Sequence, residues 1–530
     1  MQRILDPEMT APAAQARERS QPLWPLAVVI GLVLILAVLR CVFAATLDLR
    51  FDEAYYWTWS KEPVLSFLDH PPLIAWSVRL GTALFGDTLF GVRFAGLVAM
   101  ALTQLLLADI VRRRTSPHWV WPVVFVVLAM EASLDFSIMT AIVQPDVPLV
   151  LFQTALLWAL ARLDDTRDPK WWLAAGVFGG LMLLSKYSAV FVVPAMLAYL
   201  LWPPRNRGWL LTIWPWLAAA IALLLFAPVL IWNAQYDWVS FKFQFARATV
   251  PLQFSLPWIG GYIGLQFGLI GPLLCPVVAA GTIIALVRGY RQRDPLLILL
   301  TTTAVVPFLY FLWQSGSLRV GTQWTMPIWA AAFAAAAINL HDLVQSGSSL
   351  ARSATRWAIA AVASGLVIAP AVSIYYLVGG GSPLGERDPI GQAAGYEALT
   401  DQTLAVMRQS GATWMATTDY RTFSMFRWEV RDRIPVVQVN ERCRFIGFRP
   451  IDMGPIRDHP GLWVASRLRR MPEAWEGTSA QFQLLKTIDR VWGNVVYDTY
   501  DLELVLNWTP DLLPPPTSER FHCSSDGPTR

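Results

Sequence analysis

Long hydrophobic stretches recur over residues 24–378, and short polar segments separate them. A helix needs about 20 apolar residues to cross a bilayer, and the first stretch, 24–46, has that length. Further stretches follow at 89–111, 119–140, 147–163, 172–184, 188–202, 209–232, 260–288, 295–313, 324–340 and 357–378. The pattern predicts an α-helical polytopic membrane protein with about eleven transmembrane helices. Of these, 172–184 and 188–202 are short for full crossings, and the Gly- and Pro-rich stretch 260–288 is expected to be bent.

The composition supports a membrane protein. Hydrophobic residues make up 55% of the 530 residues and charged residues only 15%, which excludes an ordinary soluble chain. The net charge of +4 does not suggest a nucleic-acid partner. A cleaved signal peptide is the alternative for 24–46, but its apolar run exceeds the usual length of about 7–15 residues. We therefore expect an uncleaved first helix.

Basic residues in the short loops predict how the chain faces the membrane, because Lys and Arg are retained on the cytoplasmic side. Alternate loops hold Arg112, Arg113, Arg114, Arg162, Arg167, Lys170, Arg205, Arg207, Arg288, Arg291, Arg293, Arg352 and Arg356. The opposite loops hold fewer, namely Arg50, Lys61, Arg79, Lys186, Lys242, Arg247 and Arg319. The first set is therefore expected in the cytoplasm together with the N-terminal tail 1–22, and the second set on the outer side.

The composition changes after the membrane domain 23–378, where GGGSPLGERDP opens a polar region. A helical stretch near 392–410 and the β-rich runs RIPVVQV, GLWVAS and VWGNVVYDTYDLELVL predict a soluble outer α/β domain over 379–510. The Pro-rich tail 511–530 is expected to be disordered. Cys443 and Cys523 share the outer compartment, and both a disulfide between them and two free thiols remain open.

The first outer loop carries more charge than a connector needs. Its sequence, RFDEAYYWTWSKEPVLSFLDHPPLIAW, places Asp52 and Glu53 just beyond the first span and Asp69 and His70 shortly before the next segment. Carboxylates at the edge of a membrane cost free energy if unpaired. A solvated helix cap explains an isolated Asp-Glu pair, so the functional interpretation depends on what else reaches the same face.

Three more charged features belong to that face. Asp146 lies in VQPDVPLVLF at the start of a span, where an N-cap is the plain alternative. Lys186 lies in LLSKYSAVFVVP, where a snorkelling lysine is the alternative. Lys242 and Arg247 lie among the aromatics of WNAQYDWVSFKFQFAR, and an aromatic belt explains the tryptophans but not these cations.

Together, carboxylates and cations at the depth of the lipid headgroups indicate transfer of a group from a lipid-linked phosphate. An anionic phosphate needs Lys or Arg, and an incoming hydroxyl needs a carboxylate base within hydrogen-bonding distance. A glycosyl phosphate departs as a phosphate anion, so electrostatic stabilisation replaces a strong general acid.

These motifs carry a resemblance to a known family. DEAYYWTWS, LDHPPLIAW, QPDVPLVLF, LSKYSAVFVVP and WNAQYDWVSFKFQFAR resemble the segments of glycosyltransferase family 39, a group of GT-C membrane enzymes. The group includes protein O-mannosyltransferases, the lipid A aminoarabinose transferase and the galacturonosyltransferases of rhizobial lipopolysaccharide, and the likeness is greatest to the last. It covers about residues 25–335, while the outer domain matches only loosely.

The resemblance implies roles for individual residues. Asp52 would be the catalytic base, Glu53 would support it, and Asp146 would orient the acceptor or Asp52. Lys186 and Arg247 would bind the donor phosphate, with His70 nearby where other relatives carry lysine.

Two departures bear on the phosphate and on metal binding. Tyr55 stands where some relatives are basic, so phosphate neutralisation would rest more on Lys186 and Arg247, and a part-charged His70 leaves its own role open. Asp69 corresponds to an acidic residue near a metal in some family structures. We predict no metal or other cofactor requirement, because no His, Cys and Asp cluster in the sequence demands one.

The sequence thus predicts an inverting glycosyltransferase of the bacterial inner membrane, active on its periplasmic face. Its expected partners are membrane lipids, a polyprenyl-phosphate-linked sugar as donor, and an acceptor that is lipid A, lipopolysaccharide core, another envelope glycan or a protein. The alternative is a transporter or flippase of lipid-linked saccharide, which the mid-span pair Glu131 and Asp135 keeps open. A structural scaffold would leave Asp52 and Asp146 without a role.

Overall fold

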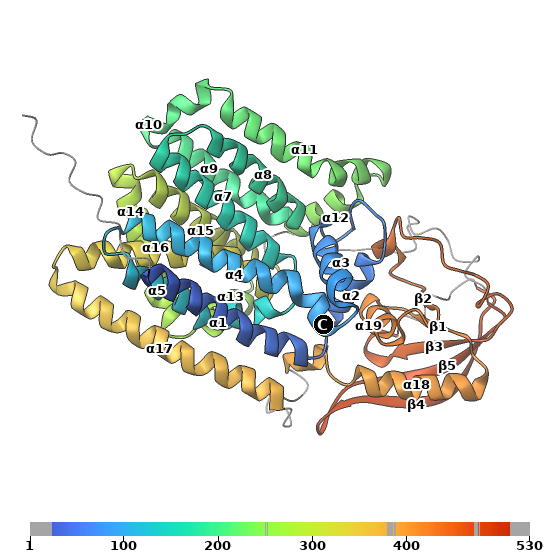
Figure 1. Cartoon of the computed structure of the whole chain (residues 1–530). Helices are drawn as coiled ribbons and strands as arrows, with labels where there is room; N and C mark the ends of the chain where they lie inside the picture. The colour runs from blue at the N-terminus through green and yellow to red at the C-terminus, as the bar shows by residue number, and fades with distance from the viewer. Residues whose placement is uncertain are drawn as a thin grey trace, which may run out of the picture.

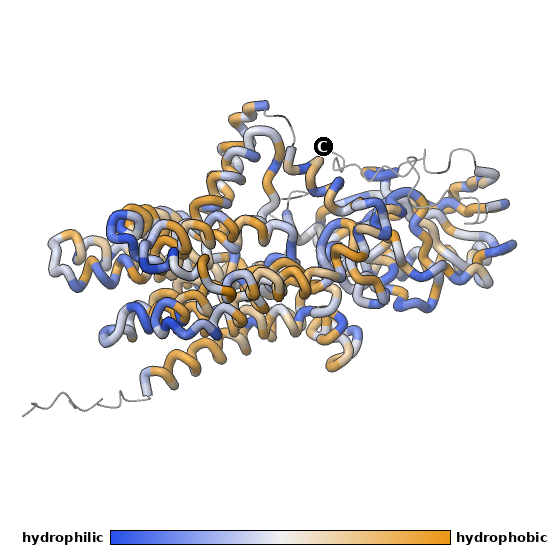
Figure 2. The backbone as a smooth tube through the Cα atoms, turned by 90° about the horizontal axis from the view of Figure 1, so that it is seen from above, coloured by the Kyte–Doolittle hydropathy of each residue, from blue (hydrophilic) through white to orange (hydrophobic). Residues whose placement is uncertain are grey.

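The computed structural model describes residues 24–249, 251, 253–378, 385, 388–470, 475 and 478–508. A bundle of long helices occupies one side of the molecule, and a smaller domain built on a sheet occupies the other (Figure 1). Hydrophobic residues dominate the bundle, whereas polar residues are more frequent in the smaller domain (Figure 2). The fold predicted from the sequence, a polytopic helical membrane protein with a C-terminal α/β domain, is confirmed.

The bundle is built from seventeen α-helices within the described residues. They are α1 (Trp24–Thr46), α2 (Phe51–Ser60), α3 (Leu73–Phe85), α4 (Leu89–Arg114), α5 (Val120–Glu131), α6 (Leu134–Ser137), α7 (Asp146–Thr166), α8 (Lys170–Ser185), α9 (Val192–Leu201), α10 (Pro204–Arg207), α11 (Trp214–Gln235), α12 (Val239–Ala248), α13 (Leu256–Ile270), α14 (Leu274–Gln292), α15 (Pro295–Gln314), α16 (Met326–Gln345) and α17 (Ser349–Val378).

Eight helices in the described part of the chain are long and apolar enough to cross a membrane, and ten if each of two bent pairs counts as one span. The sequence predicted about eleven. The difference arises where hydrophobic runs are interrupted: α5 and α6 meet at an angle of 81°, and 187–201 meets 204–211 at 104°. The bend expected within 260–288 is present, because Gly271 separates α13 from α14 with φ +112°.

The centre of the bundle is α16, whose run of alanines is almost entirely buried. Small residues allow helices to approach closely where no large side chain fits between them. At Gly365 of α17, for example, an added Cβ would lie 2.2 Å from the carbonyl oxygen of Ala132, where α5 ends. The break after α5 and the close approach of α17 therefore occur at the same place.

The C-terminal domain consists of a five-stranded sheet in the order β2-β1-β3-β5-β4 and two helices. Its elements are α18 (Tyr396–Ser410), β1 (Trp414–Thr417), α19 (Tyr420–Val430), β2 (Val436–Gln438), β3 (Gly461–Ser466), β4 (Gln481–Trp492) and β5 (Val495–Leu506). β1 pairs in parallel with β2 and β3, whereas β5 lies antiparallel to β3 and β4. The predicted helix near 392–410 matches α18, and the runs RIPVVQV, GLWVAS and VWGNVVYDTYDLELVL contain β2, β3 and β5. β1, α19 and most of β4 were not predicted.

The bounds 379–510 proposed for this domain begin in a part of the chain that the structure does not describe, as do the tails 1–22 and 511–530. These boundaries therefore stay predictions. Cys443 is buried, and Cys523 also lies outside the described residues.

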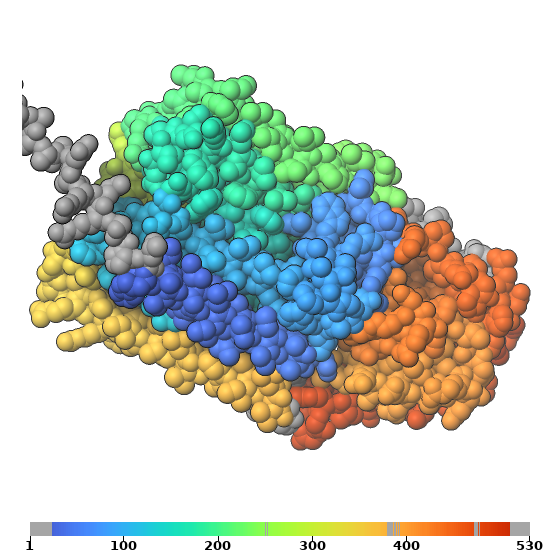
Figure 3. Space-filling view, in the orientation of Figure 1, coloured from blue at the N-terminus to red at the C-terminus, as the bar shows by residue number. Residues whose placement is uncertain are grey.

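The domain rests directly on one end of the bundle, against the segment that includes α2 (Figure 3). α19 packs along α2, the helix that carries Asp52 and Glu53. Trp57 of α2 meets Trp428 of α19 edge to face, with 5.2 Å between the ring centroids. This contact brings side chains from residues beyond 420 to the outer loop of the membrane domain.

Candidate functional site

A cavity of about 1090 Å³ lies between one end of the bundle and the C-terminal domain. Its walls come from the α2–α3 loop, the 3-10 helix η2 (Tyr187–Phe191), α12, the end of α15 and the C-terminal domain. The charged or titratable side chains lining it are Asp52, Tyr55, Tyr56, Asp69, His70, Lys186, Tyr187, Lys242, Arg247, Tyr310, Arg319, Tyr420 and Arg444. Six of the eight residues assigned to the site from sequence thus share one cavity, and Glu53 and Asp146 lie behind its wall.

Glu53 is fully buried and is held by Arg93 of α4. Nε and Nη2 of the guanidinium donate to the two carboxylate oxygens, at 2.8 and 2.7 Å. Nη1 donates to the carbonyl of Ala44 in α1, and Nη2 also donates to the carbonyl of Asp48 just beyond that helix. The backbone N–H groups of Arg50 and Val143 also donate to Glu53. This network caps α2 and ties it to α1 and α4, so the contacts of Glu53 are those of a structural residue.

Asp52, the next residue, points the other way and lines the cavity. Its one hydrogen bond among the described residues comes from the hydroxyl of Tyr420, at 3.5 Å. Burial raises the pKa of Asp52 above its usual value, although Arg50 and Arg421 act in the opposite direction. A carboxylate that is not held in an ion pair and whose pKa is raised is a better proton acceptor than one that is paired.

Asp69 is the second carboxylate of the cavity, and it is paired. Arg444 of the C-terminal domain donates to both of its oxygens, at 2.6 and 2.9 Å, and the hydroxyl of Tyr55 donates at 2.9 Å. Burial alone would raise the pKa of Asp69, but Arg444 and His70 lower it below its usual value. Asp69 therefore remains a carboxylate that anchors Arg444 in the wall.

His70 lines the cavity beside these residues. Burial, together with the nearby charges of Lys186 and Arg247, lowers its pKa to about 3. The imidazole is therefore neutral near pH 7 and adds no positive charge for a phosphate. It can still donate one hydrogen bond, and its Nδ1 is buried without a partner among the described residues.

Asp146 and Lys186 form a buried ion pair. The ammonium group donates to both carboxylate oxygens at 2.7 Å. Lys186 is in the cavity wall and also lies over the ring of Trp324, at 5.7 Å from its centroid. Asp146 thus orients Lys186. The resemblance implied a different role, in which Asp146 orients the acceptor or Asp52, and that role stays a prediction.

Arg319 lines the cavity without an ion-pair partner among the described residues, but it is exposed. Arg247 is the more buried cation of the wall that remains available. Its guanidinium lies over the rings of Trp324 and Phe243, at 5.2 and 5.7 Å, and has no carboxylate partner in the described part of the chain. Lys242 instead pairs with Asp237 at 2.6 Å and is largely exposed. Arg247 and Lys186, which share Trp324, are therefore the two cations best placed for an anion inside the cavity.

Sequence reasoning missed the residues that the C-terminal domain contributes. Tyr420 begins α19, Arg421 follows it, and Arg444 lies in the 3-10 helix η7 (Arg442–Phe445). Arg444 lies 375 positions from Asp69 in the sequence. No local pattern links positions so far apart, and the only signal was the basic run ERCRFIGFR in a domain expected to lie on the outer side.

Glu131 and Asp135 do not lie one turn apart on a continuous helix, which was the arrangement that supported the alternative of a transporter. The helix ends at Glu131, and Asp135 belongs to the bent segment α6. Glu131 pairs with Arg40 of α1. Asp135 is fully buried and faces neither this ion pair nor the lining of the outer cavity.

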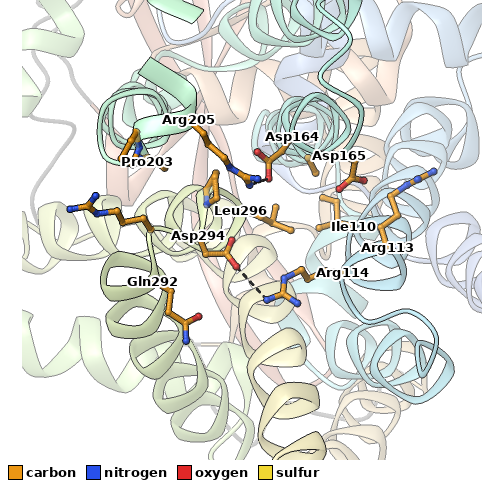
Figure 4. A pocket seen from close by; sticks show the side chains of 14 residues that line it. Ile110, Arg113, Arg114, Asp164, Asp165, Pro203, Arg205, Gln292, Asp294 and Leu296 are labelled. Atoms are coloured by element: carbon orange, nitrogen blue, oxygen red, sulfur yellow. Dashed lines mark hydrogen bonds and ion pairs between the residues drawn. The ribbon is translucent and has the colours of Figure 1, made fainter. Parts of the chain in front are cut away.

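A second cavity, of about 730 Å³, lies at the opposite end of the helices, where α4, α7, α14 and α15 meet (Figure 4). Its arginines are mostly paired: Arg205 with Asp164 at 2.6 Å and Arg114 with Asp294 at 3.3 Å. These pairs join helix ends, as expected where basic loop residues gather on one side of a membrane.

Metal binding has no candidate centre among the residues described. No group of three or more His, Cys, Asp or Glu side chains in that part of the chain is placed to hold a metal ion. The prediction that no metal or other cofactor is needed concerns the reaction and stays a prediction.

Comparison with known proteins finds similarity over part of the chain. Residues 69–232 match the model of the dolichyl-phosphate-mannose-protein mannosyltransferase family. The lipid A galacturonosyltransferase RgtD of Rhizobium johnstonii is 27% identical over 55% of this chain and 64% of its own. Undecaprenyl phosphate-alpha-4-amino-4-deoxy-L-arabinose arabinosyl transferase 1 of Pseudomonas fluorescens is 26% identical over 33% and 35%. The chain thus spans less than two thirds of the length of either relative.

The fold has solved counterparts. ArnT from Cupriavidus metallidurans in the apo state superposes with a TM-score of 0.57 at 13% identity, over 90% of this chain and 97% of that one. The same protein bound to undecaprenyl phosphate gives 0.52 at 14% identity, over 91% and 98%. The resemblance predicted from the sequence motifs is confirmed.

Proposed function

We propose, on the premise that the chain is related to the GT-C membrane glycosyltransferases of family 39, that it transfers a sugar from a polyprenyl phosphate to a hydroxyl of an envelope lipid or glycan. The observation that carries the proposal is the charge arrangement of the outer cavity. Asp52 is its one carboxylate without a cationic partner among the described residues, and Arg247 with Lys186 supplies positive charge in the same cavity.

Each group has a defined part in the reaction. The acceptor oxygen forms a bond to C1 of the sugar while the bond from C1 to the phosphate oxygen breaks. Asp52 takes the proton of the acceptor hydroxyl, and the polyprenyl phosphate leaves with the bonding electrons. Attack from the face opposite the leaving group inverts the configuration at C1. Arg247 and Lys186 stabilise the negative charge that grows on the departing phosphate.

The apolar part of the cavity fits the lipid of the donor. Val190, Phe191, Phe241, Phe245 and Phe311 line it on the side of η2, α12 and α15. Such side chains bury isoprenoid units, while the cations hold the phosphate at headgroup depth. A structure of ArnT with undecaprenyl phosphate bound has this overall fold, which supports a lipid phosphate as the ligand class.

We further propose that the cavity and the C-terminal domain face the periplasm of a bacterial inner membrane and that the N-terminus is cytoplasmic. The distribution of basic residues between alternate loops supports this orientation. The names of the relatives suggest lipid A as the acceptor to test first, with galacturonic acid and then aminoarabinose as the sugar of the donor. Undecaprenyl phosphate is named as the carrier of the second sugar, and we propose to use this carrier for both donors.

The decisive experiment measures bond cleavage. Purified protein in detergent, given donor and lipid A, should release free undecaprenyl phosphate, because the donor bond breaks in the same site where the acceptor binds. Asp52→Asn is nearly isosteric, and it should lower turnover by about 10²–10⁴-fold without weakening donor binding.

Transport gives the opposite result. Donor that stays intact in detergent with lipid A and other envelope extracts, yet changes leaflet when the protein is placed in liposomes, would assign the protein to lipid-linked saccharide transport. Near-normal turnover of the Asp52→Asn variant would instead leave the reaction standing and remove Asp52 as its base.

A further inference from the structure

Tyr420, the first residue of α19 in the C-terminal domain, contacts the proposed base Asp52. The Tyr420 hydroxyl lies 3.5 Å from Oδ1 of Asp52, and Nε of Arg421 lies 3.4 Å from the same hydroxyl oxygen. An N–H can only donate, so Arg421 occupies the acceptor side of the hydroxyl and directs the phenolic proton toward Asp52. The three side chains form a hydrogen-bonded series that crosses the boundary between the domains.

Tyr420 is held firmly in this position. Its backbone N–H donates to Glu441 at 2.6 Å, and Glu441 also accepts a hydrogen bond from Nε of Arg444. The Arg444 guanidinium lies over the Tyr420 ring, 4.4 Å from its centroid, while the ring of Tyr55 is 4.8 Å away on α2. The phenol is therefore fixed from both domains, as a group that orients another must be.

We propose that Tyr420 is a positioning residue for Asp52: its hydroxyl holds one carboxylate oxygen and leaves the other to accept the proton of the acceptor hydroxyl. The inference deepens the proposed function and rests on it. It makes the soluble domain part of the reaction site, although the family resemblance covers the membrane domain. Burial raises the pKa of Tyr420 to about 12, so the phenol remains a donor throughout the working range.

The expected pH effect has a definite sign. A hydrogen bond donated to a carboxylate stabilises its charged form and lowers its pKa. Removal of the Tyr420 hydroxyl should therefore raise the pKa of Asp52. The other charged or titratable groups that face Asp52 are Arg50, Tyr56, Asp69, Arg421 and Arg444, and all of them remain in a Tyr420→Phe variant.

The test measures undecaprenyl phosphate release from undecaprenyl-phosphate galacturonic acid and lipid A as a function of pH. In Tyr420→Phe, kcat should fall about 3- to 10-fold, the KM for the donor should stay unchanged, and the acidic limb should move up by about 0.5–1 pH unit. The matched control is Tyr500→Phe, which removes a buried phenol from β5 of the same domain, away from the cavity. It should keep the wild-type profile.

A second variant tests the same role if Tyr420→Phe folds poorly. Replacement of Tyr420 by 3-fluorotyrosine exchanges one ring hydrogen for fluorine, keeps the hydroxyl and makes it a stronger donor, so the acidic limb should move to lower pH. An acidic limb that stays in place in both variants would overturn the positioning role. If neither the wild-type protein nor Tyr500→Phe released undecaprenyl phosphate with any of the donors and acceptor extracts named under the proposed function, that function itself would be refuted.

Discussion

At the scale of single residues, the charged side chains of the site differ in whether they already have an ion-pair partner within the protein. Asp69 and Lys186 line the cavity but have partners in Arg444 and Asp146, whereas Asp52 and Arg247 have no ion-pair partner in the described part of the chain. Proton acceptance and phosphate binding draw on charges that the protein itself leaves unpaired. The presence or absence of an ion-pair partner, more than the distance to the cavity, distinguishes the residues proposed to react from those proposed to support them.

The two cations over Trp324 give a prediction at this scale. Lys186→Met and Arg247→Met each remove a charge and keep an apolar stem, and each should weaken binding of undecaprenyl phosphate about 10- to 100-fold. Because both would contact one anion, the double variant should lose less than the sum of the two free energies. Calorimetric titration in detergent measures this coupling.

The control for that cycle is Lys242→Met, which removes a cation of the cavity mouth that is largely exposed and paired with Asp237. It should change the affinity by less than about threefold. Strictly additive losses in the Lys186 and Arg247 variants would show that they do not share a phosphate.

At the scale of elements, Glu53 and Arg93 hold three helices together at the edge of the site. The pair joins the start of α2 to α4, and Arg93 also donates hydrogen bonds to the carbonyl groups at the end of α1. Removal of one partner from a buried pair leaves an uncompensated charge, which costs about 3–5 kcal/mol. Glu53→Gln should therefore lower the melting temperature of the purified protein by several degrees in scanning fluorimetry.

Two comparisons make this result specific. Asp87→Asn breaks a half-exposed pair with Lys61 and should leave the melting temperature nearly unchanged. Asp52→Asn should also melt like the wild type while turnover is lost. If Glu53→Gln kept its stability but lost turnover as Asp52→Asn does, Glu53 would belong to the reaction and not to the scaffold.

At the scale of the whole molecule, the docking of the C-terminal domain determines whether the cavity is complete. Glu62 at the end of α2 accepts hydrogen bonds from Arg427 and Arg449 of that domain, at 3.3 Å each, and is buried. Glu62→Gln weakens both contacts. We expect faster hydrogen exchange in α2 and α19 and a lower turnover, because Tyr420 and Arg444 are then held less firmly.

The matched change is Glu503→Gln, which removes the charge of a buried partner of Arg470 inside the C-terminal domain. It should alter exchange in β5 without affecting α2. Equal exchange of α2 in wild type and Glu62→Gln would contradict a docking role for this contact.

The architecture follows from the sequence by itself, and so does the gathering of the candidate site residues at one end of the helices. Hydrophobic length is a local sum, so the membrane helices and the polar C-terminal domain follow from composition along short windows. The same holds for Asp52, Lys186 and Arg247, which stand at the ends of apolar stretches and therefore had to lie at one membrane surface. Helix breaks were less predictable, because the 81° turn after α5 depends on how neighbouring helices pack.

Only the tertiary structure decided which charges neutralise each other. Glu53 and Asp146 each find a partner 40 positions away, and Asp69 finds Arg444 at a separation of 375. Ion pairs act over a few ångströms in space and leave no periodic trace in the sequence, so partner choice follows from packing alone. For the same reason, Tyr420 could not be connected to Asp52 until α19 was seen to pack on α2.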